Sequence, residues 1–348
     1  MSQHRVAPIL WCLTAAALFG ASTPAAKALL GDVGPLALAG LLYLGAAAAA
    51  LPFSFRGGSR RLAWRRSNVL MLLGAVVFGG AIGPALLMIG LTLAPAASVA
   101  LWLNLETVAT ALLAWAFFRE HLDRRTWLAV VLTVAAGIVL ASPSGFSMAP
   151  AAGLVALACV CWGLDNNLTA VIDGFTPAQT TLAKGIFAGT ANLGLAFLLE
   201  PVDLTMTVAA SALSIGGLGY GLSIVLYIHG AQHLGATRSQ ILFSTAPFMG
   251  GIVAWTALGE PILAAQLIAI GVLVPALWLL LSARHEHSHA HDEQIHTHSH
   301  RHDDGHHHHS HADLQAATRH THEHSHQPEV HAHPHVPDLH HRHEHSAV

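Results

Sequence analysis

Residues 98–120 read SVALWLNLETVATALLAWAFFRE. One ionisable side chain, Glu106, interrupts this apolar stretch before Arg119 and Glu120 end it, and about 20 apolar residues match the hydrocarbon core of a bilayer. The rest of the chain is similar in character: its 348 residues are 53% hydrophobic and 10% charged, whereas soluble domains carry about 25% charged residues. The sequence therefore predicts an all-α polytopic membrane protein.

Apolar runs between breaker residues predict ten transmembrane helices. Their expected ranges are 8–30, 35–54, 69–92, 96–117, 125–141, 153–172, 177–199, 208–232, 236–258 and 262–282. The connections between them are short, so neighbouring helices should run antiparallel. The first run is longer than the roughly 7–15 residues of a signal-peptide core, and we expect it to remain as a helix.

The distribution of Lys and Arg predicts the orientation in the membrane. Arginines gather in residues 56–66 and 119–125, and Arg5, Arg238 and Arg284 fall on the same side. The connections on the other side carry no Lys or Arg. We therefore expect a multi-pass protein of the inner (plasma) membrane, with the lipid bilayer as its first partner and both termini in the cytoplasm.

The two halves of the chain resemble each other. Residues 239–260, SQILFSTAPFMGGIVAWTALGE, align with residues 98–120, and the same offset places Gly219 against Gly79. Each copy has five predicted helices, an odd number, so the second copy should cross the membrane upside down. Inverted repeats are typical of secondary transporters, whose substrate site lies near the bilayer midplane between the repeats.

These two stretches, with the openings ALFGASTPAAKALL (17–30) and CVCWGLDNNLTAVI (159–172), resemble the EamA repeat of the drug/metabolite transporter superfamily. The resemblance implies two inverted five-helix repeats, over residues 8–141 and 153–282, followed by a tail over 283–348. It also implies alternating access and movement of small solutes, often outward and coupled to an ion gradient. Thr107 stands where the second copy has Pro247, so the first copy should lack a proline kink.

Ionisable and polar residues inside predicted membrane helices are costly and suggest function. The expected transport pathway comprises Asn104, Glu106, Asp165, Asn166, Asn167, Lys184, Tyr227 and Gln232. A carboxylate in hydrocarbon needs a partner or a proton, so Glu106 and Asp165 are the main candidates. The alternative is a purely structural pair of Lys184 with one of them. Lys27 is expected to extend to the membrane surface.

His229 and His233 are spaced i, i+4, so they share one helix face and could hold one metal ion near the cytoplasmic end. In the alternative interpretation, His229 is a satisfied core histidine and His233 marks the boundary with water. Two ligands alone do not complete a metal site.

The tail is rich in histidine. Four of the 28 histidines precede it, and the other 24 lie in residues 285–345. With almost no large apolar residues, the tail cannot bury a core and is expected to be disordered. Neutral imidazoles suit Zn, Cu and Ni, and ten acidic residues against four arginines add a negative field. The first expected ligands are His285, His287, His289, His291, His306, His307, His308 and His309.

The sharpest functional hypothesis is export of a divalent metal (nickel, cobalt or zinc) collected by the tail. One alternative is export of an amino acid, drug or other metabolite, with the tail only regulatory. Another is a membrane-anchored metal store or sensor, in which the tail serves as a passive buffer or a pH sensor. No phosphate-binding loop and no hydrolytic triad is present in the sequence, so we expect neither an ATP-driven pump nor an enzyme. We expect no cofactor and no nucleic-acid partner. We do expect the protein to form a homodimer.

Overall fold

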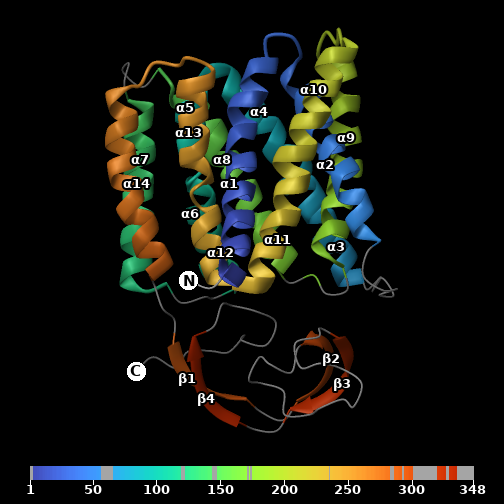
Figure 1. Cartoon of the computed structure of the whole chain (residues 1–348), viewed down its shortest axis with the longest axis vertical. Coiled ribbons are helices and arrows are strands. Elements are labelled where there is room, and N and C mark those ends of the chain that lie inside the picture. Colours follow the sequence, from blue (N-terminus) through green and yellow to red (C-terminus); the bar gives the residue numbers. More distant parts are fainter. Residues whose placement is uncertain are drawn as a thin grey trace. The chain divides into compact units, whose positions relative to one another are not determined.

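The computed structural model consists of two compact units, divided after Ala283. It describes residues 3–55, 66–118, 122–142, 147–170, 172, 175–234, 236–282, 286–291, 294–300, 320–326 and 329–334. In the first unit, every described element is helical (Figure 1). The helices are α1 (Gln3–Leu29), α2 (Pro35–Ser54), α3 (Arg66–Gly74), η1 (Ala75–Ile82), α4 (Gly83–Leu93), α5 (Ala96–Trp102), α6 (Leu105–Phe118), α7 (Arg124–Ala141), α8 (Ala149–Ala170), α9 (Pro177–Leu199), α10 (Met206–Gly216), η2 (Gly217–Leu222), α11 (Ser223–Leu234), α12 (Ala236–Phe243), α13 (Ala246–Ala257) and α14 (Ala264–Ser282).

These helices confirm the prediction of an all-α membrane protein. Within the described part of the chain, nine helical segments are long and apolar enough to cross a bilayer. The ninth of the ten predicted spans, 236–258, is made of two shorter helices in series, α12 and α13. A turn at Ser244 and Thr245 separates them, so neither helix alone has the length of a span.

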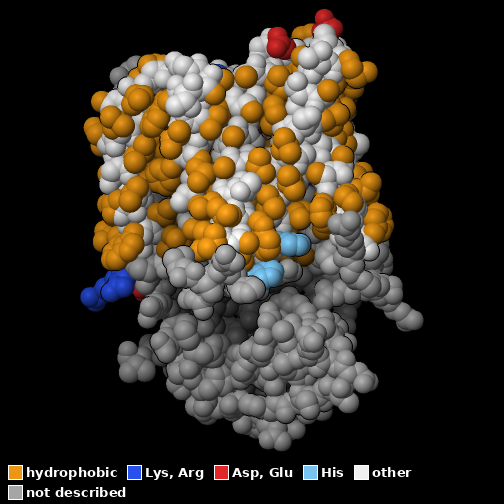
Figure 2. All heavy atoms as spheres, in the orientation of Figure 1, with side chains coloured by type: hydrophobic (Ala, Val, Ile, Leu, Met, Phe, Trp, Pro, Cys, Tyr) orange, Lys and Arg blue, Asp and Glu red, His pale blue; other side chains and the backbone are white. Residues whose placement is uncertain are grey.

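Charged side chains lie at opposite ends of the helical unit (Figure 2). One end, called the basic end below, carries Arg66, Arg124 and Arg125 at the starts of α3 and α7. The other, called the acidic end, carries the connections after α1, α9 and α13, with their carboxylates Asp32, Glu200, Asp203 and Glu260. The side surface between the two ends is mostly hydrophobic, as contact with lipid requires (Figure 2).

The fourth and ninth predicted spans are interrupted at equivalent places. The turn between α5 and α6 falls at Leu103 and Asn104, and the turn between α12 and α13 falls at Ser244 and Thr245. The sequence predicted that the fourth span, which has Thr107 instead of a proline, would have no kink. This prediction is wrong, because the span is interrupted all the same. Without a proline, side chains take over, because Asn104 Nδ2 donates to the Leu101 carbonyl (2.9 Å) and Thr107 Oγ1 donates to the Asn104 carbonyl (2.7 Å).

Two π-helical segments, η1 and η2, lie within the third and eighth spans. They occupy corresponding places in the two halves, since Gly79 of η1 and Gly219 of η2 are aligned in sequence. A π-helical turn widens the helix and leaves carbonyl groups without their usual partners, and such turns are frequent at functional sites. This local feature has no recognisable signal in the apolar pattern.

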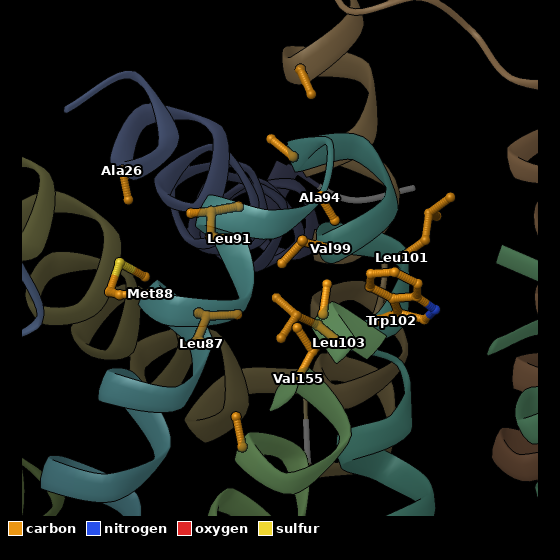
Figure 3. Packing of buried hydrophobic residues seen from close by; sticks show 14 of the residues in the cluster. Ala26, Leu87, Met88, Leu91, Ala94, Val99, Leu101, Trp102, Leu103 and Val155 are labelled. Atoms are coloured by element: carbon orange, nitrogen blue, oxygen red, sulfur yellow. The ribbon is translucent and has the colours of Figure 1, made fainter. Parts of the chain in front are cut away.

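A central part of the hydrophobic core lies where α4, α5 and α8 meet (Figure 3). Leu87, Leu91, Val99 and Val155 are each no more than 1% exposed, and Trp102 packs beside them at 1%. The buried Trp102 indole is satisfied, because its Nε1 donates to the Gly137 carbonyl of α7 (3.0 Å). The core therefore fixes the first half of the chain against α8, the first helix of the second half.

In the second unit, the described residues form four short strands. β1 (Glu286–His291) pairs antiparallel with β4 (Glu329–Pro334), and β2 (Gln294–His300) pairs antiparallel with β3 (His320–His326). Their His-x-His alternation has a period of two residues, which suits a strand as well as an extended chain. The rest of the tail that is predicted to be disordered lies outside the described residues.

Candidate transport site

An ion pair joins α8 and α9 in the helical unit. Lys184 Nζ lies 2.7 Å from Asp165 Oδ2, and the two side chains are 18% and 6% exposed. Asp165 also accepts from its own helix, through Thr169 Oγ1 to Oδ1 (3.0 Å). Of the two structural pairs considered from the sequence, the structure forms Asp165–Lys184. A buried carboxylate is thereby neutralised, as a low-dielectric setting demands.

Glu106 lies on α6 and contacts α8 through Asn166, the residue that follows Asp165. Its Oε1 accepts from Asn166 Nδ2 (2.9 Å), and the same amide donates to Thr110 Oγ1 (3.2 Å). The adjacent Asn167 bridges the two helices by donating to the carbonyls of Thr110 (3.1 Å) and Gly163 (2.8 Å). Glu106 is thus held by a neutral amide.

The π-helical segment η1 packs directly against the ion pair. A methyl group at Gly79 would lie 2.5 Å from Asp165 Cβ and closer still to its carboxylate, so only glycine permits this approach. The Gly79 carbonyl accepts two side-chain hydrogen bonds, from Tyr43 OH (2.6 Å) and from Trp162 Nε1 (2.9 Å). We call the group of Tyr43, Glu106, Asp165, Asn166 and Lys184 the central polar cluster.

The second half repeats this geometry without the charges. At η2, a methyl group on Gly219 would meet Ser22 Cβ at 2.6 Å, so Ser22 of α1 takes the place that Asp165 has beside Gly79. Gly250 occupies the position that aligns with Thr110, and it lies against Gly20 of α1. The cluster thus draws ionisable groups from both repeats, Glu106 from the first and Asp165 and Lys184 from the second, whereas the residue beside Gly219 is the uncharged Ser22.

Five aromatic rings form a continuous row beside the cluster, called the aromatic row below. Successive ring centres lie 5.9 Å apart for Tyr43–Tyr220, 5.7 Å for Tyr220–Phe19, 5.4 Å for Phe19–Phe243 and 4.9 Å for Phe243–Tyr227. All five residues are partly exposed. The row ends near the basic end, where Tyr227 OH donates to Gln240 Oε1 (2.8 Å).

The structure brings together only part of the predicted pathway. Glu106, Asp165, Asn166, Asn167 and Lys184 lie in or beside the cluster, whereas Asn104 turns back to its own helix. Tyr227 is connected to the cluster only through the aromatic row, and the side chain of Gln232 lies outside the described residues.

Sequence reasoning missed Tyr43, Trp162 and Thr110. A signal existed for Tyr43, since it is one of only three tyrosines and a tyrosine in an apolar helix needs a partner for its hydroxyl.

His229 and His233 are both exposed on α11, and within the described part of the chain neither makes a hydrogen bond or ring contact with the central polar cluster. The Trp11 ring packs edge-on against both imidazoles, with ring centres 6.0 and 5.5 Å apart, and His233 Nδ1 lies 2.8 Å from the His229 carbonyl oxygen. Both imidazole rings are exposed, so the alternative interpretation of His229 as a core histidine is wrong. Among the described residues, no three His, Cys, Asp or Glu side chains come together in a way that could hold a metal ion.

The tail ligands expected from the sequence are only partly placed. His287, His289 and His291 belong to β1. His285, His306, His307, His308 and His309 lie outside the described residues.

Comparison with known proteins decides the family. The model of the EamA-like transporter family matches the chain twice, over residues 6–142 and 149–282. The chain belongs to the EamA-like transporter family. As an EamA-like protein of the drug/metabolite transporter superfamily, it is a multi-pass membrane transporter of a small solute, and the resemblance drawn from the sequence is confirmed.

This EamA-like protein is also similar to a curated protein and to a solved structure. It is 25% identical over 235 residues to an uncharacterized transporter of Methanothermobacter thermautotrophicus, an alignment that covers 65% of this chain and 68% of the relative. A solved crystal structure is similar with a TM-score of 0.56 and 18% identity, over 79% of this chain and 96% of the other. The first likeness supports transport without naming a substrate, and the second shows the fold alone.

Proposed function

We propose that this EamA-like protein exports a small cation in exchange for protons, and that Glu106 binds the cation and the proton in turn. The observation that carries the proposal is the charge of the central polar cluster. The cluster contains two carboxylates and one ammonium group, and the ammonium group of Lys184 is paired with Asp165 at 2.7 Å. When both carboxylates are ionised, one formal negative charge therefore remains on Glu106, whose hydrogen-bond partner Asn166 is a neutral amide.

A proton or a cation would neutralise that charge, and intramembrane carboxylates commonly serve as proton relays for this reason. Glu106 is partly exposed and Asn166 is exposed, so both groups are accessible rather than sealed in the core. Competition between a proton and a cargo cation for one carboxylate couples their movements in opposite directions. The Asp165–Lys184 pair is assigned a positioning role, because it holds α8 against α9 and η1.

Divalent nickel, cobalt or zinc is the cargo that the tail favours. Its 24 histidines would collect such ions, and both termini are proposed to lie on the cytoplasmic side of the inner membrane. Collection on that side would raise the local metal concentration for outward transport. His229 and His233, exposed on α11, are proposed as a transfer point rather than as part of the central site.

An organic cation, such as an amine-bearing metabolite, is the second candidate. Two observations favour it: no three metal-ligating side chains meet among the described residues, and the aromatic row leads up to Tyr43 of the cluster. Aromatic faces attract organic ammonium groups by about 0.5–2 kcal/mol each. In this case the tail would regulate the protein or store metal.

Transport into proteoliposomes with an imposed pH gradient tests the proposal and separates the two cargoes. Ni²⁺, Co²⁺, Zn²⁺ and tetraethylammonium would be supplied in turn to the wild-type protein, to Glu106→Gln and to a chain ending at Ala283. Asp32→Asn is the matched control, since it neutralises an exposed carboxylate at the acidic end.

We expect proton-driven movement of a divalent ion that Glu106→Gln abolishes and Asp32→Asn preserves. Movement of tetraethylammonium instead would establish the second candidate. Transport that Glu106→Gln leaves intact, or that ignores the pH gradient, would contradict the proposal.

A further inference from the structure

Glu200 connects the two repeats at the acidic end. Glu200 is the C-cap residue of α9. Its carboxylate accepts hydrogen bonds from the backbone N–H groups of Leu36 (2.9 Å) and Ala37 (3.2 Å) at the start of α2. The preceding Gly34 offers no side chain to cap this helix. Glu200 therefore supplies the missing cap from another helix, where a negative charge also suits the helix dipole.

Glu260 makes the same contact with a second helix. Its carboxylate accepts from the backbone N–H groups of Ala96 (2.6 Å) and Ala97 (2.9 Å) at the start of α5. This helix is preceded by Pro95, which likewise provides no side-chain cap. Gly259, with a φ of 65°, adopts the left-handed conformation that ends α13 and lets the chain present Glu260.

The local sequence explains why both carboxylates point out of their own helices. Each is followed by proline, at Pro201 and Pro261, and a residue before proline is driven away from the α conformation. Glu200 accordingly has an extended backbone, with φ −122° and ψ 149°. Its carboxyl carbon would lie 2.7 Å from a methyl group on Gly34, so the close contact depends on that glycine.

Lys27 reinforces the second contact from α1. Its Nζ donates to the carbonyls of Leu91 (2.6 Å) and Ala94 (3.3 Å), at the end of α4. The expectation that Lys27 extends to the membrane surface is thus replaced by a capping role at a helix C-terminus. The turn between α4 and α5 is therefore held from both directions. Lys27 binds the carbonyl groups that end α4, and Glu260 binds the N–H groups that begin α5.

We propose that Glu200 and Glu260 are paired latches that close the acidic end of the transporter and release when that end opens. Both contacts join the second repeat, residues 149–282, to helix starts in the first, residues 6–142. In an inverted-repeat transporter, one repeat rocks against the other, so contacts between repeats at one end must break as that end opens. This inference concerns the conformational change and holds for any cargo.

Side-specific labelling of cysteines tests the latches. A reporter, Val33→Cys, would sit beside Gly34 at a position that is 7% exposed, in a chain whose three native cysteines are replaced by alanine. A second reporter, Ser54→Cys, would sit at the opposite end of α2, where the residue is also 7% exposed. Each would be combined with Glu200→Gln plus Glu260→Gln and labelled in proteoliposomes with a membrane-impermeant maleimide.

We expect labelling of Val33→Cys to rise at least about tenfold, the shift produced by about 1.4 kcal/mol, and labelling of Ser54→Cys to fall. The matched control, Asp32→Asn plus Asp203→Asn, removes two carboxylates from the same end and should change neither rate. Contacts that merely stabilise the fold would raise labelling at both ends when lost, which would overturn the proposal, as would unchanged labelling. If the double variant does not fold, Gly34→Ala displaces Glu200 alone and should shift both rates in the expected directions.

Discussion

The contact of Gly79 with Asp165 allows a quantitative test of the site. In Gly79→Ala the new methyl group would lie 2.5 Å from Asp165 Cβ, whereas carbon atoms pack at about 3.5–4.0 Å. Asp165 Cβ is one bond from the α8 backbone, so a change of rotamer cannot relieve the clash. We expect α8 to move away from η1 by about 1 Å and to disturb the 2.7 Å pair with Lys184.

Overpacking costs about 1–3 kcal/mol, and a buried ion pair that loses a partner costs about 3–5 kcal/mol. Because the ion pair should separate only partly, we expect Gly79→Ala to lower the free energy of unfolding by about 2–4 kcal/mol in total. Equilibrium unfolding in mixed SDS micelles measures it, with reaction of the three buried cysteines as the signal of unfolding.

Two matched glycine substitutions isolate the charge effect. Gly219→Ala, at the corresponding place in η2, meets the uncharged Ser22 side chain at 2.6 Å and the Leu18 carbonyl oxygen at 3.4 Å, and it should cost about 1–3 kcal/mol. Gly251→Ala meets nothing within 4 Å, so it should be neutral or slightly stabilising. The reasoning is refuted if Gly79→Ala costs no more than Gly251→Ala, or if its cost is unchanged when Asp165 is first replaced by alanine.

Other parts of the structure give further predictions. Gln266 is fully buried and bonds Ser98, Trp255 and the Leu263 amide, so Gln266→Leu should lower the free energy of unfolding by about 2 kcal/mol in the same assay. Asn104→Ala removes one side-chain bond at the α5–α6 turn and should cost about 1 kcal/mol, whereas the exposed Thr92→Ala should cost less. The full chain should bind several Zn²⁺ ions at pH 7.5 that the chain ending at Ala283 does not, and calorimetry should show release below about pH 6.5, because protonated imidazole cannot bind metal.

The apolar pattern predicted the membrane spans because each span must be continuous in sequence. Where a span is interrupted, the pattern failed: α12 and α13 look like one run, and the turn at Ser244 depends on local hydrogen bonds to Ile241 and from Thr245 to Leu242. The π-helical segments were invisible for a similar reason, although the alignment of Gly79 with Gly219 was correct.

The site was predicted in composition but not in geometry. Intramembrane charge singled out Glu106, Asp165 and Lys184, and their position inside membrane-spanning helices makes that signal strong. Which carboxylate pairs with Lys184 depends on how α8 packs against α9, and the sequence does not contain that information directly. Tyr43 joins the cluster through a backbone carbonyl, a partner without any side-chain signature.

Contacts between distant helix ends were the least predictable. Glu200 and Leu36 are 164 residues apart, as are Glu260 and Ala96, so only the folded packing reveals them. The i, i+4 spacing of His229 and His233 correctly predicted a shared face, but the orientation of α11 directs that face to the surface near Trp11.

Proton release on cation binding is the most direct test of the role proposed for Glu106. The chain ending at Ala283, which lacks the histidines of the tail, would be titrated with Ni²⁺, Co²⁺, Zn²⁺ and tetraethylammonium in weakly buffered detergent solution. Competition at one carboxylate predicts release of up to about one proton per chain with the transported cation, and none with Glu106→Gln. Equal release from the wild-type and Glu106→Gln chains, or cation binding with no release from either at any pH, would contradict it.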